Sequence, residues 1–157
     1  MNFFVVFGQA NEELDKRNGF KDIKLLSKID QYDNLEIDKQ LDPEHFIGQY
    51  KRTRSSYPSI GEIEVKDLTL LTYKGIVYQI NIVTAKNPQL YKGLVKAFGK
   101  AQHSVRYQKY FWEGKNVKLT FESIASNKLQ LIYYAKGIKK IMKSDKIKKI
   151  EQLATEF

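Results

Sequence analysis

Apolar and polar residues alternate most regularly between Ile76 and Ile82, where the sequence reads IVYQINI. One face, found by counting every second residue, is apolar and comprises Ile76, Tyr78, Ile80 and Ile82. The other face is more polar and includes Gln79. A period of two with one apolar face is typical of a strand that buries one side against a core. The pattern therefore predicts a half-buried strand over residues 76–82.

The residues around this strand predict a hairpin before it and a helix after it. Residues 68–73 form another β-rich run, and Lys74-Gly75 between the two runs suits a tight turn, because glycine adopts positive φ freely. After the strand, Asn87 and Pro88 suit the N-cap and first position of a helix, and Gly99 suits the position just past its end. The expected apolar face of this helix comprises Leu90, Tyr91, Leu94, Val95 and Phe98.

Weaker patterns extend the sheet on both sides of this central stretch. We expect further strands over residues 20–26, 46–50, 60–71, 105–112, 117–122 and 129–134. A C-terminal helix is expected to begin at Ser144 or Asp145 and to dock its apolar face on the sheet. That face comprises Ile147, Ile150, Leu153, Ala154 and Phe157. The order of elements predicts an α+β fold, with a largely antiparallel sheet, one central helix packed on one face and a C-terminal helix.

Residues 1–10, MNFFVVFGQA, combine a short apolar run with small residues at Gly8 and Ala10. This combination is typical of the end of a secretory signal peptide, and the alternative is a plain N-terminal strand over FFVVF. A signal peptide would leave residues 11–157 as a single domain, periplasmic or secreted, whereas a retained Met1 would indicate a cytoplasmic protein. A length of 157 residues suits one domain, and the absence of cysteine excludes disulfides and thiolate chemistry.

The charge of the chain is basic and unevenly distributed. The formal net charge is +9, from 27 basic and 18 acidic residues, and residues 1–44 sum to −4 while residues 45–157 sum to +13. A basic excess favours anionic partners, but a lysine-rich solvated surface produces the same balance without any partner. Lysine outnumbers arginine by 23 to 4. Because specific readers of phosphates and bases tend to use the planar arginine fork, we favour the solvated surface.

One acidic pattern offers enzyme chemistry. The sequence EVK at residues 64–66 lies on an expected strand, and Asp42 or Glu44 lies about twenty residues upstream. This spacing matches a Mg²⁺-dependent nuclease of the PD-(D/E)xK type, in which carboxylates hold the metal and the lysine orients water. The same acid-x-Lys spacing recurs at Asp22 and Glu113 in this lysine-rich chain. A solvated ion pair is therefore the favoured interpretation.

A metal site built from His45 and His103 is the less favoured alternative. Each lacks a second ligand at the usual spacing, so two surface histidines are the favoured interpretation. We assign no catalytic residue, no metal site and no cofactor.

Aromatic side chains offer the most attractive binding surface. The pairs Phe111-Trp112 and Tyr133-Tyr134 lie on expected strands, so the two members of each pair must point to opposite faces. An exposed aromatic strip flanked by lysines can bind a glycan, a peptide or a protein edge. The basic run at residues 51–54 is a second candidate, for phosphate groups. The candidate binding residues are Tyr107, Tyr110, Trp112, Tyr133, Tyr134, Arg52 and Arg54.

The C-terminal segment is rich in lysine, with seven lysines and one acid in residues 136–149. It could contact phosphates, or lie on an anionic membrane surface with Ile138, Ile141 and Met142 inserted. Docking of the helix on the sheet, with its lysines in water, is the favoured interpretation.

Several segments between Gly19 and Tyr134 together resemble a known kind of protein. They are GFKDIKLLSKI, the KGIVYQINI hairpin, the helix end AFGKA, the strand pair YFWEGKNVKLTFES and the last strand LIYY, after an FGQA start. In these segments the chain resembles small exported domains of unknown function from Bacteroidetes-type bacteria, including PepSY-like and lipoprotein-like α+β modules. The resemblance implies a periplasmic or envelope-associated domain that is usually not an enzyme.

We therefore expect a non-enzymatic exported module that binds an unidentified protein, peptide or glycan, or interacts with the cell envelope. The alternative is a basic nucleic-acid-binding protein, with the nuclease as its enzymatic extreme. The sequence predicts no oligomeric state.

Overall fold

The computed structural model describes residues 10–157 and confirms the predicted α+β fold. The predicted signal peptide and its alternative, the FFVVF strand, lie outside the described residues except for Ala10. The elements in chain order are α1 (Glu12–Arg17), β1 (Gly19–Phe20), β2 (Ile23–Lys24), η1 (Ile29–Gln31), β3 (Leu35–Asp42), η2 (Pro43–His45), β4 (Ile47–Arg52), β5 (Ser59–Ile60), β6 (Ile63–Tyr73), β7 (Ile76–Ala85), α2 (Pro88–Phe98), β8 (Gln102–Ser104), β9 (Lys109–Glu113), β10 (Val117–Ala125), β11 (Lys128–Ala135) and α3 (Ile138–Ala154).

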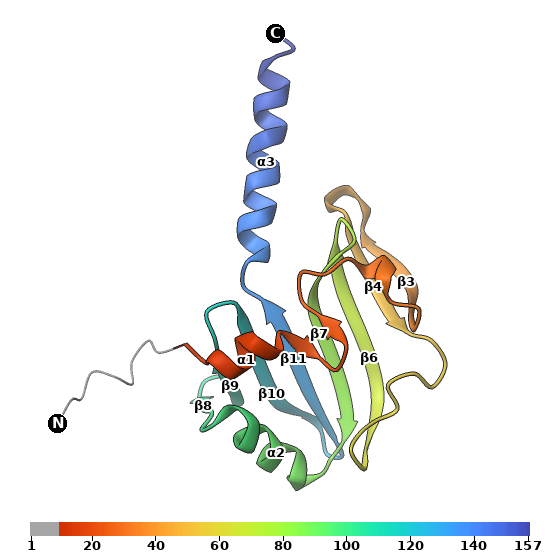
Figure 1. Ribbon diagram of the computed structural model, residues 1–157, viewed down its shortest axis with the longest axis vertical. Coiled ribbons are helices and arrows are strands. Elements are labelled where there is room, and N and C mark those ends of the chain that lie inside the picture. Colours follow the sequence, from red (N-terminus) through yellow and green to blue (C-terminus); the bar gives the residue numbers. More distant parts are fainter. Residues whose placement is uncertain (1–9) are drawn as a thin grey trace, which may run out of the picture.

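The main sheet is antiparallel and has nine strands in the order β3-β4-β6-β7-β11-β10-β9-β8, with the short β5 paired to β6. The helices α1 and α2 and the separate β1–β2 hairpin lie over one face of this sheet, which we call the covered face (Figure 1). We call the opposite face the open face. The last helix, α3, follows β11 and extends away from the sheet (Figure 1).

The core lies between the covered face and the helices, and strand alternation builds it. In β11, Leu131 and Tyr133 are buried on the covered face, while Ile132 and Tyr134 are only half-buried on the open face. The neighbouring β10 repeats the pattern, with buried Val117, Leu119 and Phe121 between half-buried polar residues. The alternation predicted from the sequence for residues 117–122 and 129–134 is therefore confirmed.

The strand β7 confirms the predicted hairpin but not the facing of its first residues. Ile80 and Ile82 are buried as expected, but Val77 is fully buried and Tyr78 is half-exposed. Pairing with β6 shifts register at this point and leaves Tyr78 as an extra, bulged residue. A bulge re-aims the side chains beside it, so the prediction that Tyr78 shares a face with Ile80 is wrong.

The helix α2 follows its predicted capping signals. The Asn87 side chain accepts a hydrogen bond from the Gln89 backbone N–H at 2.8 Å, and Pro88 occupies the first turn. Gly99 ends the helix with φ of +85°. Leu90 and Leu94 are buried against the sheet, as their spacing predicted.

Two predicted strands are interrupted. The run predicted over residues 20–26 is a tight β1–β2 hairpin with Lys21 at φ of 53°, and β9 begins only after Gln108, whose φ is 55°. Val105, expected in a strand, is 75% exposed in the turn after β8. Positive φ at a lysine or glutamine is uncommon, so these turns leave no clear signal in the sequence.

The helix α3 differs from its prediction at both ends. It begins at Ile138, so the predicted capping residues Ser144 and Asp145 lie inside it. Ile138 is only 1% exposed, so it is not available to a membrane as proposed for it. The predicted apolar face from Ile147 onward is exposed to solvent, so the expected docking of this face on the sheet is wrong.

Candidate functional site

A groove of about 630 Å³ lies between the α1–β2 segment and α2, on the covered face of the sheet. Its volume falls within the range of about 300–1,000 Å³ that is usual for small-ligand sites. The residues that line it are Arg17, Gly19, Phe20, Lys21, Lys24, Ile60, Gly61, Ile63, Gln89, Leu90, Gly93, Leu94, Ala97, Phe98, Leu131 and Tyr133. Most of these are apolar, and we call this feature the α1/α2 groove.

The α2 wall of the groove is apolar and contains a glycine. Leu90, Leu94, Ala97 and Phe98 form the wall, and Gly93 lies among them. A Cβ added at Gly93 would meet nothing within 4 Å. Glycine inside a helix costs roughly 1 kcal/mol relative to alanine, so this position leaves space in the groove at the expense of helix stability.

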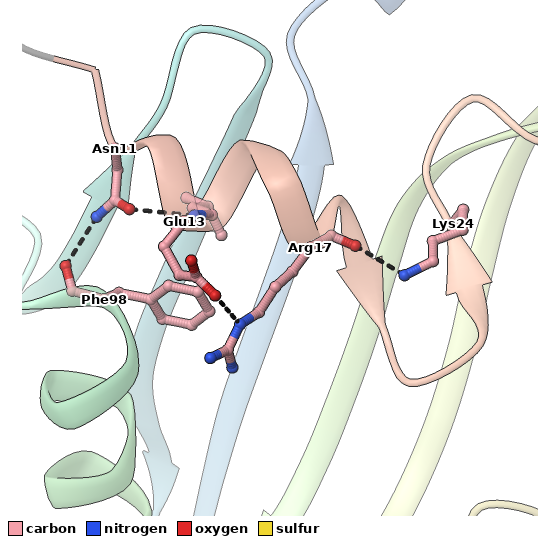
Figure 2. Close-up of polar contacts among 6 residues, drawn as sticks. Asn11, Glu13, Arg17, Lys24 and Phe98 are labelled. Atoms are coloured by element: carbon pink, nitrogen blue, oxygen red, sulfur yellow. Dashed lines mark hydrogen bonds and ion pairs between the residues drawn. The ribbon is translucent and has the colours of Figure 1, made fainter.

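One side chain joins the two helices at the end of the groove. Asn11 caps α1 through Oδ1, which accepts from the Leu14 backbone N–H at 3.1 Å, and its Nδ2 donates to the Phe98 carbonyl oxygen at 2.8 Å (Figure 2). Leu14 is fully buried beneath α1. The relative position of α1 and α2 therefore depends on both a polar contact and core packing.

The opposite side of α1 is attached to the β9–β10 turn. Asp15 accepts hydrogen bonds from the backbone N–H groups of Lys115, Asn116 and Val117 at 2.7, 2.9 and 3.0 Å. Hydrogen bonds to an ionised carboxylate are shorter and stronger than neutral ones. This contact attaches α1 to the sheet and thereby positions one side of the groove.

Tyr133 lies in the floor of the groove and is only 6% exposed. Its ring packs against Phe20 at 6.4 Å between centroids. Burial raises the pKa of Tyr133 to about 12, and the positive charge of Arg17 opposes that rise. Because no described residue hydrogen-bonds to its hydroxyl, the neutral phenol is available as a donor to a ligand.

Three cations stand along the α1–β2 side of the groove. Arg17 donates from Nε to Glu13 Oε1 at 2.8 Å, and its Cζ lies 5.2 Å from the Phe98 ring centroid. Figure 2 shows the two terminal nitrogens of Arg17 without a bond to the other residues drawn. The hydrogen bond from Arg17 lowers the pKa of Glu13.

The other two cations keep their charges uncompensated. Lys24 donates from Nζ to the backbone carbonyl oxygen of Arg17 at 2.9 Å (Figure 2), and Lys21 Nζ lies 5.7 Å from the Phe20 ring centroid. No carboxylate is among the described residues that line the groove. The groove thus combines apolar walls, a cationic edge and one buried phenol.

The aromatic residues predicted to form one binding strip are divided by the structure. Tyr107 is exposed in the β8–β9 turn, and Tyr110 contacts Tyr91 at 5.0 Å on the covered face. Trp112 is buried, and its Nε1 donates to the Gly99 carbonyl oxygen at 2.8 Å. Of the predicted residues, Tyr133 alone lines the α1/α2 groove.

Tyr134 lies on the open face, away from that groove. Its ring packs edge-on against the bulged Tyr78 at 6.4 Å. Gln79, which pairs with Tyr134 between the strands, and Asn81 also emerge there, joined by a hydrogen bond of 2.9 Å, and all three side chains are half-buried. The open face offers contact area, and none of Tyr78, Gln79, Asn81 and Tyr134 lines the α1/α2 groove.

The two predicted arginines have different surroundings. Arg52 donates to the backbone carbonyl oxygens of Tyr57, Val65 and Lys66 at 3.1, 3.0 and 3.3 Å. Its guanidinium therefore holds the loop before β5 against β6 and is occupied within the chain. Arg54 is exposed at the tip of that loop.

The acidic residues of the nuclease hypothesis are far apart. Glu64 and Lys66 form an exposed ion pair of 3.1 Å, as the solvated-pair interpretation predicted. Asp42 aligns through β4 with Tyr73, nine residues along β6 from Glu64. At about 3.3 Å per residue the two acids lie about 30 Å apart. Within residues 10–157, no group of three or more His, Cys, Asp or Glu residues could hold a metal ion.

Comparisons of the chain with protein-family models, with curated protein sequences and with solved structures found no match. The resemblance to exported Bacteroidetes-type domains therefore stays a prediction, and function must be argued from the geometry of the groove.

Sequence reasoning missed most of the groove. Gly93 was visible as a glycine inside a predicted helix, and Arg17, Lys21 and Lys24 as cations spaced over eight residues. Neither signal pointed to the other, because the α1–β2 segment and α2 meet only in the folded chain.

Proposed function

We propose that this protein is a non-enzymatic binding module whose α1/α2 groove takes a single-chain amphiphile with an anionic end. The observation that carries the proposal is the composition of the groove, whose apolar walls are lined by three cations. Among the described residues only Arg17 of these three is paired with a carboxylate, that of Glu13 outside the lining. An acyl chain or similar apolar body would lie along Leu94 and Phe98. Its anionic end would meet Arg17 and the hydroxyl of Tyr133.

The charges favour an anionic ligand over a neutral one. A carboxylate or phosphate can accept from the free terminal nitrogens of Arg17 in the two-point geometry that guanidinium offers. The pKa of about 12 keeps the phenol of Tyr133 protonated at neutral pH, so it donates and does not repel an anion. The proposal includes the exported location expected from the N-terminal sequence.

The proposal is tested by titrating the full chain with dodecanoate, and with dodecyl maltoside as the uncharged comparison, below their micelle concentrations. Trp112 reports binding through its fluorescence, because its ring lies 6.3 Å from the Phe98 ring that lines the groove. We expect saturable one-to-one binding of dodecanoate and at least about tenfold weaker binding of dodecyl maltoside, one lost charge-assisted contact being worth about 1.5–3 kcal/mol.

A variant that fills the groove separates specific binding from surface adsorption. In Gly93→Leu the new side chain extends into open space, so the fold is retained while the groove is obstructed. Displacing about two methylene groups of the ligand costs about 1.6 kcal/mol, which is more than tenfold in affinity. Lys92→Leu adds the same side chain on α2 outside the groove and should leave affinity unchanged.

Two results would overturn this assignment. Dodecanoate that binds Gly93→Leu as tightly as the unmodified chain would place the ligand elsewhere, and absence of saturable binding would remove the amphiphile class. The exported location fails separately if the natively produced protein still begins at Met1.

A further inference from the structure

The helix α3 carries two apolar stripes on different sides. Ile138 is buried and Ile141 and Met142 are half-buried, so the first stripe packs near the body of the protein. The second stripe comprises Ile147, Ile150, Leu153 and Ala154, and Phe157 follows three residues past the end of the helix. At about 100° per residue, the centre of the second stripe is rotated by about 140° from that of the first. The first stripe accounts for the contact of α3 with the domain, and the second has no role in it.

The second stripe is exposed and has no cover within residues 10–157. Ile147, Ile150 and Leu153 are 46%, 58% and 53% exposed. Figure 1 shows α3 extending away from the sheet beyond its first turns. Isolated exposed apolar residues are common, but a run of them at helical spacing on a projecting helix indicates a contact surface.

The first half of α3 has a defined attachment that ends at Asp145, midway along the helix. Asp145 accepts from the Tyr73 hydroxyl at 2.8 Å, and its carboxylate lies 3.3 Å from Lys74 Nζ. The helix therefore leaves the domain in a defined direction, and residues 146–157 are presented beyond this anchor.

The same helix is strongly basic. It holds six lysines, namely Lys139, Lys140, Lys143, Lys146, Lys148 and Lys149, against Asp145 and Glu151. None of the six takes part in an ion pair with another described residue. At helical spacing these lysines are distributed around the whole axis, so the positive charge surrounds the helix.

The exposed apolar stripe and the lysines around the helix together indicate which kind of partner α3 contacts. A second copy of the chain would bring two helices of net charge +4 together, which like-charge repulsion opposes. A nucleic acid would neutralise the lysines but leave the apolar stripe unused. The headgroup layer of an anionic bilayer satisfies both features, because it surrounds an inserted helix with negative charge and offers acyl chains to its apolar side chains.

We propose that residues 146–157, the second half of α3 and the three residues after it, dock on the surface of a bilayer that contains anionic lipids, with Ile147, Ile150 and Leu153 at the boundary between headgroups and acyl chains. The lysines, which lack arginine's two-point geometry, serve as diffuse charges in the headgroup layer. The contact is peripheral, since no helix in the described part of the chain has the length and apolar character to cross a bilayer. This inference is independent of the groove and its ligand.

The test is co-sedimentation of the full chain with vesicles of phosphatidylcholine alone and of phosphatidylcholine with 30% phosphatidylglycerol. We expect binding to the anionic vesicles only, weakened by added salt. The triple variant Lys146→Gln, Lys148→Gln and Lys149→Gln should lose roughly 100-fold in affinity, taking about fivefold for each lysine near the surface. The double variant Ile150→Gln and Leu153→Gln should lose at least about tenfold, because it removes the apolar contact.

Matched control variants remove exposed lysines, or exposed apolar side chains, from positions outside α3. Lys86→Gln, Lys115→Gln and Lys128→Gln change three exposed lysines outside α3, and Val105→Gln with Ile124→Gln changes two exposed apolar residues. All substituted positions are exposed, so circular dichroism should show an unchanged fold. Both control variants should bind like the unmodified chain.

Several outcomes would overturn the proposal. Equal binding to neutral and anionic vesicles, no binding to either, or equal losses in the controls would each do so. A dimer in sedimentation equilibrium that Ile150→Gln and Leu153→Gln abolish would identify a second copy as the occupant. Binding to duplex DNA that survives the apolar variant, without vesicle binding, would identify a nucleic acid.

Discussion

Asp15 and Gly114 fit together across the junction between α1 and the β9–β10 turn. The carboxylate of Asp15 accepts three backbone hydrogen bonds from the residues after Gly114, and a Cβ built on Gly114 would overlap that carboxylate. The glycine is therefore required for close approach rather than for an unusual φ. This relationship determines where α1 lies on the sheet and hence the width of the groove.

Gly114→Ala should destabilise the protein by about 1–3 kcal/mol, because the new methyl group displaces the Asp15 carboxylate from its three donors. Urea unfolding of the variant measures the loss. Gly93→Ala is the matched control, since open space surrounds that position and alanine favours the helix. It should stabilise the protein by about 0.5–1 kcal/mol. A Gly114→Ala variant as stable as the unmodified chain would show that the turn shifts without cost.

Asn11→Ala should loosen α1 from α2, since it removes the N-cap of α1 and the hydrogen bond to the Phe98 carbonyl. We expect a loss of about 1–2 kcal/mol and faster amide hydrogen exchange throughout α1. Asn87→Ala removes an equivalent cap from α2 without touching α1. It should cost about 1 kcal/mol and leave exchange in α1 unchanged. If both variants accelerate exchange in α1 equally, Asn11 is not the specific link between the helices.

Tyr133 should make the protein sensitive to alkali. Burial raises its pKa to about 12 from an ordinary value near 10, so the folded state favours the neutral phenol. This contribution to stability is complete below pH 10 and is lost as pH rises from about 10 towards 12. Burial also raises the pKa of Tyr57, to about 12, and the pKa values of Tyr73, Tyr78 and Tyr134. Absorbance at 295 nm should therefore show a set of late-ionising tyrosines, and Tyr133→Phe should remove one tyrosine from the latest phase of the titration. An unchanged latest phase in that variant would contradict the assignment.

Asp145 should make the attachment of α3 sensitive to acid. The hydrogen bonds from Tyr73 and then Lys74 lower the pKa of Asp145. A lowered folded-state pKa means that the contact contributes fully above the ordinary value near 3.8, and is lost as pH falls through the lower, folded-state pKa. Hydrogen exchange of the first two turns of α3 should therefore accelerate below about pH 4. Asp145→Asn should show fast exchange already at pH 6, whereas unchanged exchange at that pH would assign the attachment to Ile138 alone.

Local signals predicted the central elements well. Asn87, Pro88 and Gly99 each act on the backbone beside them, so the bounds of α2 could be predicted from the chain alone. The alternation of apolar and polar residues along β10 and β11 was equally predictable from the sequence, because one face of each strand is buried. The bulge at Tyr78 was not predictable, since it arises from the register of β7 against β6 rather than from either sequence.

The groove could not be predicted because its parts are remote in sequence. Arg17 and Gly93 are 76 residues apart, and Tyr133 follows 40 residues later. What brings them together is the pair of contacts made by Asn11 and Asp15, both of which involve backbone groups. Backbone acceptors and donors are present at every position, so the sequence does not reveal which ones a side chain will use. Tyr133 was singled out for its aromatic neighbour, not for its place in the floor of the groove.

The pairing of β7 with β11 has a consequence for how the protein folds. The two strands are neighbours at the centre of the sheet, yet 42 residues separate Ala85 from Lys128. The pairings from β3 to β7, and from β8 to β11, are between strands close in sequence, so each half can assemble by local contacts. Joining the halves closes a long loop and should limit the folding rate. Ile63 and Tyr133 come from different halves, so the groove is completed only in that step, and a chain stalled before it lacks the groove.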